Sequence, residues 1–250
     1  MEEAFELANY LPLSFKTPTE QEYIAFLWDA FERNYSKGNY QFAFLAYHML
    51  TMSFVYFNIW QIRQARPDDF EKGLIGFKGD DEKSLWSTTS PFVFSKVGES
   101  NVLRLLKLIN CDNSKIGTYA KLVKDRNEIA HSNGNIFFST EEALEKKITE
   151  TLRVVSEIQS YSKPIIEQTY REFLLQNYDP ELREYPENTD QIREVLIHGN
   201  YLSQKDIDIC IGSNLSVIAD NPEIENIRAL HEALRSILAC FINLFTFSNR

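Results

Sequence analysis

The 250-residue sequence lacks the motifs of several large protein classes. Its three cysteines, Cys111, Cys210 and Cys240, are odd in number and far apart, which fits reduced thiols better than a disulfide framework or a zinc site. There is no Walker loop, no glycine-rich dinucleotide fingerprint and no His-Glu-x-x-His. We therefore expect no cofactor and no bound metal.

At the N-terminus, no basic region leads into an apolar one, so we do not expect a secretory signal. We expect a cytoplasmic location. The stretch from Phe42 to Trp60 carries no formal charge and has about the length of a membrane span. Polar side chains such as His48, Thr51 and Asn58 are spread along it, and no basic flank precedes it. We interpret it as the central helix of a bundle or one face of a dimer, not as a membrane contact.

Basic residues are outnumbered by acidic ones, 26 to 36, which gives a net charge of −10. This balance argues against a protein that coats nucleic acid without selection, since such proteins gain affinity by neutralising phosphates. Residues 96–126 are an exception, with seven basic and three acidic side chains. A phosphate-bearing ligand is expected there, although a solvated basic helix face explains the same pattern.

Strand-like alternation and internal repeats are absent from the sequence, and helical periodicity runs through most of it. We predict an all-α fold with a helical domain over residues 1–178 and a helical C-terminal extension over 179–250, separated by the proline-marked segment 179–186. Residues 67–99 are expected to form a long excursion with little regular structure. Helix caps are predicted at Thr19, Ser100, Ser139, Asn188 and Ser203.

One helix is predicted to end near His131, followed at once by Ser132, Asn133 and Gly134. Arg126 and His131 are five residues apart, about 140° around an ideal helix, so they act together only if the long arginine reaches round the helix or the helix unwinds at the histidine. Asn127 and His131, four apart, share a face of the helix. The simplest alternative makes His131 a cationic C-terminal cap and Arg126 a surface charge. A second Arg-x4-His match, Arg193 to His198, has Glu194 after the arginine and is interpreted as coincidence.

The pattern Arg126-Asn127-x-x-Ala130-His131, in a helix between a long aromatic helix and another long helix, resembles the HEPN superfamily. The resemblance covers roughly residues 19–178 and implies a helical bundle of the kind found in RNases of bacterial defence and toxin–antitoxin systems. It implies that Arg126 and His131 form the catalytic pair, with Asn127 as polar partner. Some family toxins carry a modified tyrosine where this sequence has Asn133, so control by that modification is not expected.

The chemistry of these side chains suits RNA cleavage by the substrate's own 2′-hydroxyl. Histidines supply acid and base near neutral pH, and arginine matches two phosphate oxygens. Two protomers would supply two histidines around one phosphate, in agreement with the resemblance to a dimerising family. We therefore predict a metal-independent endoribonuclease that leaves 2′,3′-cyclic phosphate and 5′-hydroxyl ends, with Lys121 and Lys124 on the RNA backbone.

Two other functions are compatible with the sequence. One is a module that binds RNA, a nucleotide or a partner protein without cutting it. The other is a helical scaffold with a vestigial motif. If the chain is a ribonuclease, we also expect an inhibitor, antitoxin or sensor protein that restrains it.

Overall fold

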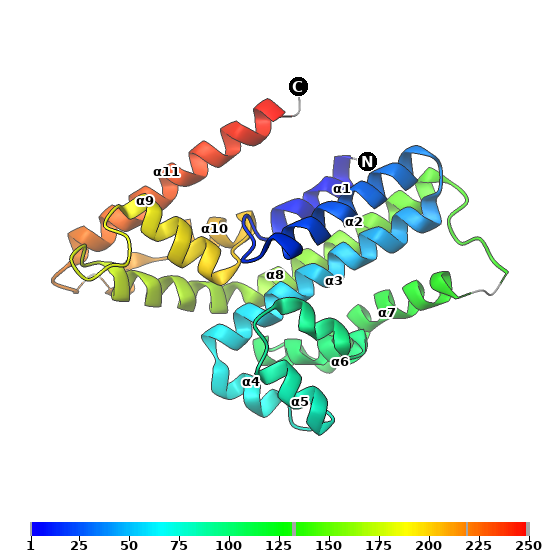
Figure 1. The fold of residues 1–250 in the computed structure, drawn as a ribbon, viewed down its shortest axis with the longest axis horizontal. Helices are drawn as coiled ribbons and strands as arrows, with labels where there is room; N and C mark the ends of the chain where they lie inside the picture. The colour runs from blue at the N-terminus through cyan, green and yellow to red at the C-terminus, as the bar shows by residue number, and fades with distance from the viewer. Residues whose placement is uncertain (1, 132–133, 219, 249–250) are drawn as a thin grey trace. The chain divides into compact units, whose positions relative to one another are not determined.

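The computed structural model describes residues 2–131, 134–218 and 220–248 (Figure 1). In the last helix, side chains are described as far as Leu238. The described residues are mostly helical. Among them, the β-type pairing is limited to one isolated bridge between Pro12 and Ser203. The prediction of an all-α fold is confirmed.

The chain divides into two compact units. The first contains the chain up to Leu11 together with Thr17–Ser162, and the second contains Pro12–Lys16 together with the chain from Lys163 onward. The division falls inside one long helix, before the boundary predicted at residues 178/179. The reason is that side chains late in this helix, such as Ile166 and Tyr170, are buried in the core of the second unit.

The first unit is organised around α3 (Tyr40–Ala65), which packs along α2 (Pro18–Ser36). Within the described residues, α3 alone is long and apolar enough to cross a membrane, and 83% of its apolar window is buried inside the structure. Its polar side chains have partners: Thr51 donates to the Tyr47 carbonyl (2.9 Å), and the Asn58 amide oxygen accepts from Ser162 (2.6 Å). The interpretation of this stretch as a buried bundle helix is confirmed.

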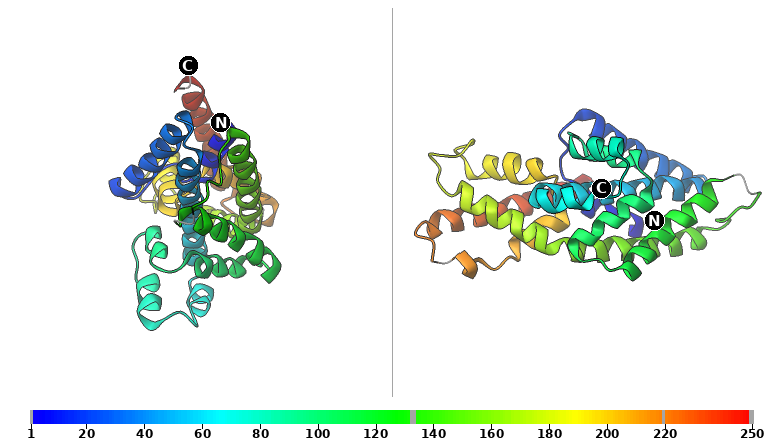
Figure 2. Two further views of the ribbon diagram at one scale, coloured as in Figure 1. Left: turned by 90° about the vertical axis from the view of Figure 1, so that its right-hand side faces the viewer. Right: turned by 90° about the horizontal axis from the view of Figure 1, so that it is seen from below.

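The expectation of an irregular excursion over residues 67–99 is wrong. This part of the chain forms short helices that gather at the C-terminal end of α3 (Figures 1 and 2). They are α4 (Pro67–Gly73), α5 (Gly79–Trp86) and the 3-10 helix η2 (Pro91–Lys96). After them come α6 (Glu99–Arg104) and the 3-10 helix η3 (Leu105–Ile109), in the region where the cap at Ser100 predicts a helix. The sequence does contain signals for the start of these helices. Proline stands at the first position of α4 and η2, and acidic residues occupy the first turn of α5.

The first unit also contains α7 (Asn113–Ala130), the first part of α8 (Glu141–Asn177) and, near the N-terminus, α1 (Glu2–Phe5) and the 3-10 helix η1 (Glu6–Tyr10). The helix α8 continues through Pro164 as one helix and ends at Asn177, next to the boundary predicted at residues 178/179. Several caps lie one or two residues away from the predicted ones. Thr17 caps α2, Gly98 precedes α6, Thr140 bonds the first turn of α8, and Glu187 precedes α9.

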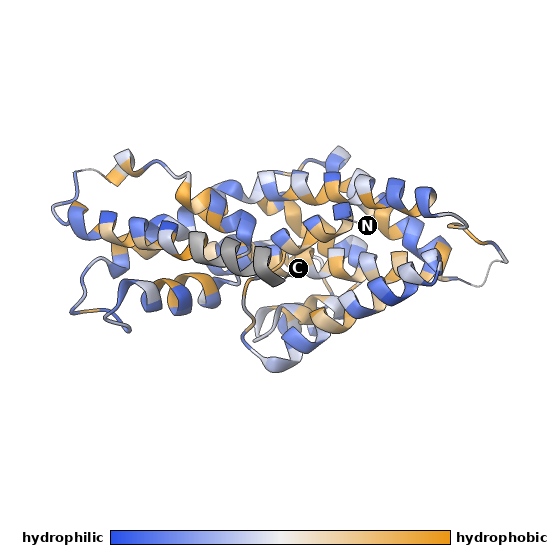
Figure 3. Cartoon of the chain, turned by 90° about the horizontal axis from the view of Figure 1, so that it is seen from above, coloured by the Kyte–Doolittle hydropathy of each residue, from blue (hydrophilic) through white to orange (hydrophobic). Residues whose placement is uncertain are grey.

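The second unit contains the end of α8, α9 (Asn188–Gln191), the π-helix η4 (Ile192–His198), α10 (Gln204–Ile211), η5 (Leu215–Ile218) and α11 (Ile224–Ser248). Its helices show hydrophobic and hydrophilic faces (Figure 3), and the hydrophobic residues form their own core. The predicted cap at Ser203 is confirmed, in a reciprocal capping box with buried Asp206. Near it, buried Cys210 is a free thiol, as is Cys111 in the first unit.

Candidate functional site

Helix α7 carries the Arg-x4-His motif in its last turn. Asp112 caps its start by accepting a hydrogen bond from the Lys115 amide (2.8 Å). At its end the backbone leaves the helix at His131, which is extended (φ −85°, ψ 145°) and whose amide still bonds the Asn127 carbonyl (3.1 Å). The His131 side chain is exposed. Ser132 and Asn133 lie outside the described residues.

The end of α7 is tied to its neighbours by a glutamine and a lysine. Gln41 of α3 donates to the Ile129 carbonyl (3.2 Å) and accepts from the Phe137 amide (3.0 Å), so one side chain joins α7 to the segment that follows the motif. Lys147 of α8 pairs with Asp125 at 2.5 Å, and its side chain is 14% exposed. These contacts fix the last turn of α7, and with it the orientation of Arg126 and Asn127.

The Arg126 guanidinium forms an ion pair inside the first unit. Its Nη2 lies 2.5 Å from Oε1 of Glu99, at the start of α6, with side chains 29% and 17% exposed. The other carboxylate oxygen of Glu99 lies 3.1 Å from Nε2 of His48 on α3. The His48 side chain is 3% exposed. One carboxylate therefore connects three helices through two basic side chains, and we call this group the Glu99 cluster.

His48 and Arg126 lower the pKa of the Glu99 carboxyl. Burial on its own raises the pKa of a carboxyl, but hydrogen bonds and charge from His48 and Arg126 outweigh it and hold the pKa of Glu99 below its ordinary value. Near neutral pH Glu99 is therefore an anion that holds Arg126 in place. Tyr56 lies beside the cluster, and burial together with the Glu99 charge raises its pKa.

Arg126 and Glu99 form part of the lining of a pocket of about 810 Å³ in the first unit. Its walls come mainly from α2, α3, η2 and α6, and they are rich in aromatic and methionine side chains: Tyr23, Met49, Met52, Tyr56 and Phe92. The rings of Tyr23 and Phe92 meet edge to face, with centroids 5.1 Å apart. A second carboxylate, Glu20, accepts a hydrogen bond from Ser90 (2.7 Å) in this lining. The pocket combines flat apolar surfaces with one cation and two acids.

The predicted site residues are only partly gathered here. Arg126 faces the pocket, whereas Asn127, half-buried, and His131, exposed, are not in its lining. Within residues 2–131, Arg126 pairs with Glu99 and makes no hydrogen bond or ion pair with His131. Lys121 and Lys124 are exposed on α7 away from the pocket, and Lys124 lies 3.9 Å from Glu128. A single protomer thus orients the arginine and leaves the histidine in solvent.

Glu99 was not identified from the sequence. His48 was expected only to lie in the core of the bundle or in a dimer interface. The available signal was His48 itself, because an imidazole in an uncharged helix needs a partner when it is buried. Which residue supplies that partner depends on how α6 packs on α3, and the sequence pattern does not give this contact.

Comparison with protein-family models, curated proteins and solved structures gives no significant match. Among the described residues, no group of three or more His, Cys, Asp or Glu side chains is arranged to hold a metal ion. The geometry of the Glu99 cluster and of its pocket therefore carries the functional argument.

Proposed function

We propose that this protein is an endoribonuclease that cleaves RNA by attack of the 2′-hydroxyl on the adjacent phosphate, through Arg126 and His131. The products are a 2′,3′-cyclic phosphate and a 5′-hydroxyl: the O2′–P bond forms as the P–O5′ bond breaks. The proton of the 2′-hydroxyl goes to a base, and an acid protonates the leaving oxygen. The observation that carries the proposal is a guanidinium oriented in a pocket wall one turn before an exposed histidine.

Glu99 acts as a positioning residue in this proposal. Its Oε1 contacts Nη2 of Arg126, and a guanidinium has five N–H donors in a planar fork. A carboxylate on one edge leaves the geometry of the other edge suited to two phosphate oxygens. Asn127, next to Arg126 in the half-buried last turn, would contribute a further polar contact to the phosphate or orient the pair.

The complete site would be built from two protomers. Arg126 and His131 do not meet in one chain, and the reaction needs both a base and an acid. Apolar side chains around this end of α7 fit a second copy: Phe42, next to Gln41, is 61% exposed, and Ile136, next to Phe137, is 78% exposed. Two copies facing each other there would supply two histidines and two arginines around one phosphate.

The test is incubation of the purified protein with end-labelled RNA in EDTA, with the new ends mapped. We expect His131→Ala and Arg126→Ala each to lower the cleavage rate by at least about 100-fold, because each removes a group that acts in the transition state. The second motif match supplies matched controls in the same chain: His198→Ala and Arg193→Ala should leave the rate within about twofold. His198 bonds Ser14 (3.2 Å), and Arg193 lies 4.0 Å from Asp190.

The proposal fails if wild type and His131→Ala treat RNA identically while both remain folded and in the same oligomeric state. Cleavage that survives in His131→Ala but disappears in His198→Ala would likewise overturn the assignment.

A second candidate function, a module that binds RNA or a nucleotide without cutting it, is favoured by the ion pair itself. The charge of Arg126 is already matched by Glu99 in the resting chain, so phosphate has to compete with a half-buried carboxylate. This module would retain RNA in a filter-binding assay and release it uncut. Binding unaffected by His131→Ala, with no new ends formed, selects this candidate.

A further inference from the structure

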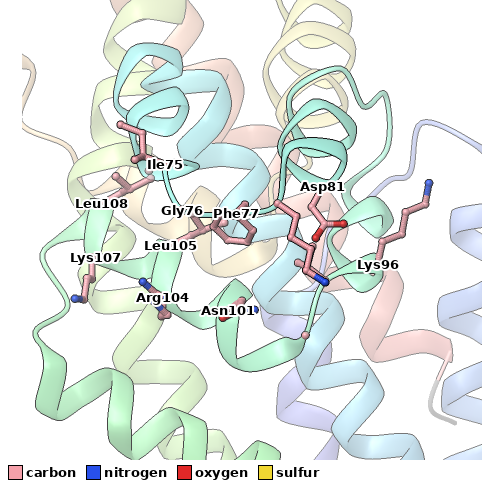
Figure 4. A pocket seen from close by; sticks show the side chains of 14 residues that line it. Ile75, Gly76, Phe77, Asp81, Lys96, Asn101, Arg104, Leu105, Lys107 and Leu108 are labelled. Atoms are coloured by element: carbon pink, nitrogen blue, oxygen red, sulfur yellow. The ribbon is translucent and has the colours of Figure 1, made fainter.

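A second pocket, of about 510 Å³, lies in the first unit among the short helices that follow α3 (Figure 4). Its lining comes from the end of α4, the segment up to α5, the segment before α6, α6 itself and η3. Its volume is within the range of pockets that hold small organic ligands. We call it the cationic pocket, because of the side chains at its rim.

Four basic side chains line this pocket: Lys78, Lys96, Arg104 and Lys107. All four are exposed, and among the described residues none of them forms an ion pair. Asp81 is the acidic residue of the lining. Unpaired like charges around one hollow repel one another, so an anion that enters gains attraction from several of them at once.

The local positive charge of residues 96–126 is divided by the fold into paired and unpaired cations. Near the motif, Lys124 pairs with Glu128 and Arg126 with Glu99, and earlier in α7 Lys115 pairs with Glu157. Lys96, Arg104 and Lys107 instead belong to the lining of the cationic pocket, with Arg104 and Lys107 at one end and Lys96 at the other (Figure 4). The phosphate-binding character expected of this segment is therefore strongest at this pocket.

The inner surface of the pocket is suited to a flat, partly apolar group. Leu105 is 2% exposed, and Leu108 and the half-buried Phe77 also contribute apolar surface, while the Asn101 amide adds a polar side chain to the lining. Gly76 adopts a positive φ of 97° that side chains disfavour, and a Cβ at that position would meet no atom within 4 Å. The backbone at Gly76 is thus open to solvent on this side, while the amides of its neighbours Ile75 and Phe77 bond the carbonyls of Lys72 and Leu74.

We propose that the cationic pocket binds a nucleotide, with its phosphates at Arg104 and Lys107 and its base against Phe77, Leu105 and Leu108. Arginine and lysine are the side chains that recognise phosphate oxygens, and the apolar surface between them accepts a base. The same chemistry is presented by a free nucleotide and by an RNA segment. The site is separate from Arg126 and His131 and does not depend on cleavage.

The experiment is isothermal titration calorimetry of the full-length chain at about 50 mM salt, where phosphate contacts are strongest. Three probes are titrated: ATP, inorganic pyrophosphate, and a 2′-O-methylated RNA hexamer, which lacks the nucleophilic hydroxyl and cannot be cut. The test variant is Arg104→Glu/Lys107→Glu. Lys83→Glu on α5 is the control, because it makes the same kind of charge change at an exposed position outside the pocket lining.

We expect at least one probe to bind wild type, and the double variant to weaken that binding at least tenfold, while Lys83→Glu changes it less than twofold. Binding of ATP and pyrophosphate identifies free nucleotide phosphates as the ligand, and binding of the hexamer alone identifies RNA; either result supports the proposal. No binding of any probe up to about 1 mM, or equal weakening by Lys83→Glu, overturns it. Unchanged thermal unfolding of the double variant separates lost binding from lost folding.

Discussion

The Glu99 cluster and the cationic pocket use the same kinds of side chain for opposite purposes. They are adjacent in the first unit, since Val97 and Gly98 line both pockets. In the cluster, a carboxylate neutralises a cation and fixes its position. In the cationic pocket, the basic groups are exposed and form no ion pair with a carboxylate in the described part of the chain. Arg126 is therefore held in a fixed position by its partner, whereas the exposed cations of the pocket are available to attract an anion. The net charge of the sequence does not distinguish these two kinds of cation.

The largest effect on folding stability is expected for Glu99→Ala. This change leaves buried His48 without its acceptor and Arg126 without its partner, and we expect the free energy of unfolding to fall by about 1–3 kcal/mol. Urea denaturation followed by circular dichroism measures the change.

The control for Glu99→Ala is Glu128→Ala, which removes the partner of an exposed pair with Lys124, whose side chains are 76% and 53% exposed. It should change the free energy of unfolding by less than about 0.5 kcal/mol. Equal losses in the two variants would contradict the distinction between buried and exposed pairing.

A smaller effect is expected from pH. Because the folded pKa of Glu99 lies below its ordinary value of 4.5, its contribution to stability is present above pH 4.5 and is lost as pH falls through the folded pKa. Wild type should therefore be more stable than Glu99→Gln at neutral pH, and the difference should shrink below about pH 4.5. Thermal melts of both proteins from pH 7 to pH 3 test this, and a difference that stays constant over that range would argue against it.

The smallest effect on stability is expected at the cationic pocket. Lys107→Glu changes an exposed, unpaired charge and relieves repulsion from Arg104, so the free energy of unfolding should change by less than about 0.5 kcal/mol. Urea denaturation beside Lys83→Glu provides the comparison. If the free energy of unfolding fell by more than about 1 kcal/mol, Lys107 would have a structural role, and the proposed difference between the two pockets would not hold.

Local signals predicted much of the fold. The uncharged run from Phe42 gives the buried helix α3, and the small turn-prone residues after His131 give the end of α7. The capping box at Ser203 depends on residues three apart and was also predictable. The short helices over residues 67–99 were missed because each is close to the minimum length of a helix and depends on packing rather than periodicity.

The candidate site was predictable only in part. The sequence pointed to Arg126 and His131, but it could not show that Arg126 meets Glu99 and that Glu99 meets His48. Those contacts join residues far apart in the chain and depend on how α3, α6 and α7 pack. The same applies to the basic segment, because only tertiary structure decides which cations acquire a carboxylate.

The burial of α3 also has a consequence for biosynthesis. This helix is completed well before α7 and α8, which supply its later contacts, such as Gln41 with Ile129 and Asn58 with Ser162. At ribosomal speeds of about 5–20 residues per second, on the order of ten seconds pass before α8 is made. During that time the uncharged, aromatic stretch of α3 is covered by α2 and by shorter helices, but it still lacks α7 and α8. The segment that organises the folded unit is therefore the part of the nascent chain most in need of a chaperone.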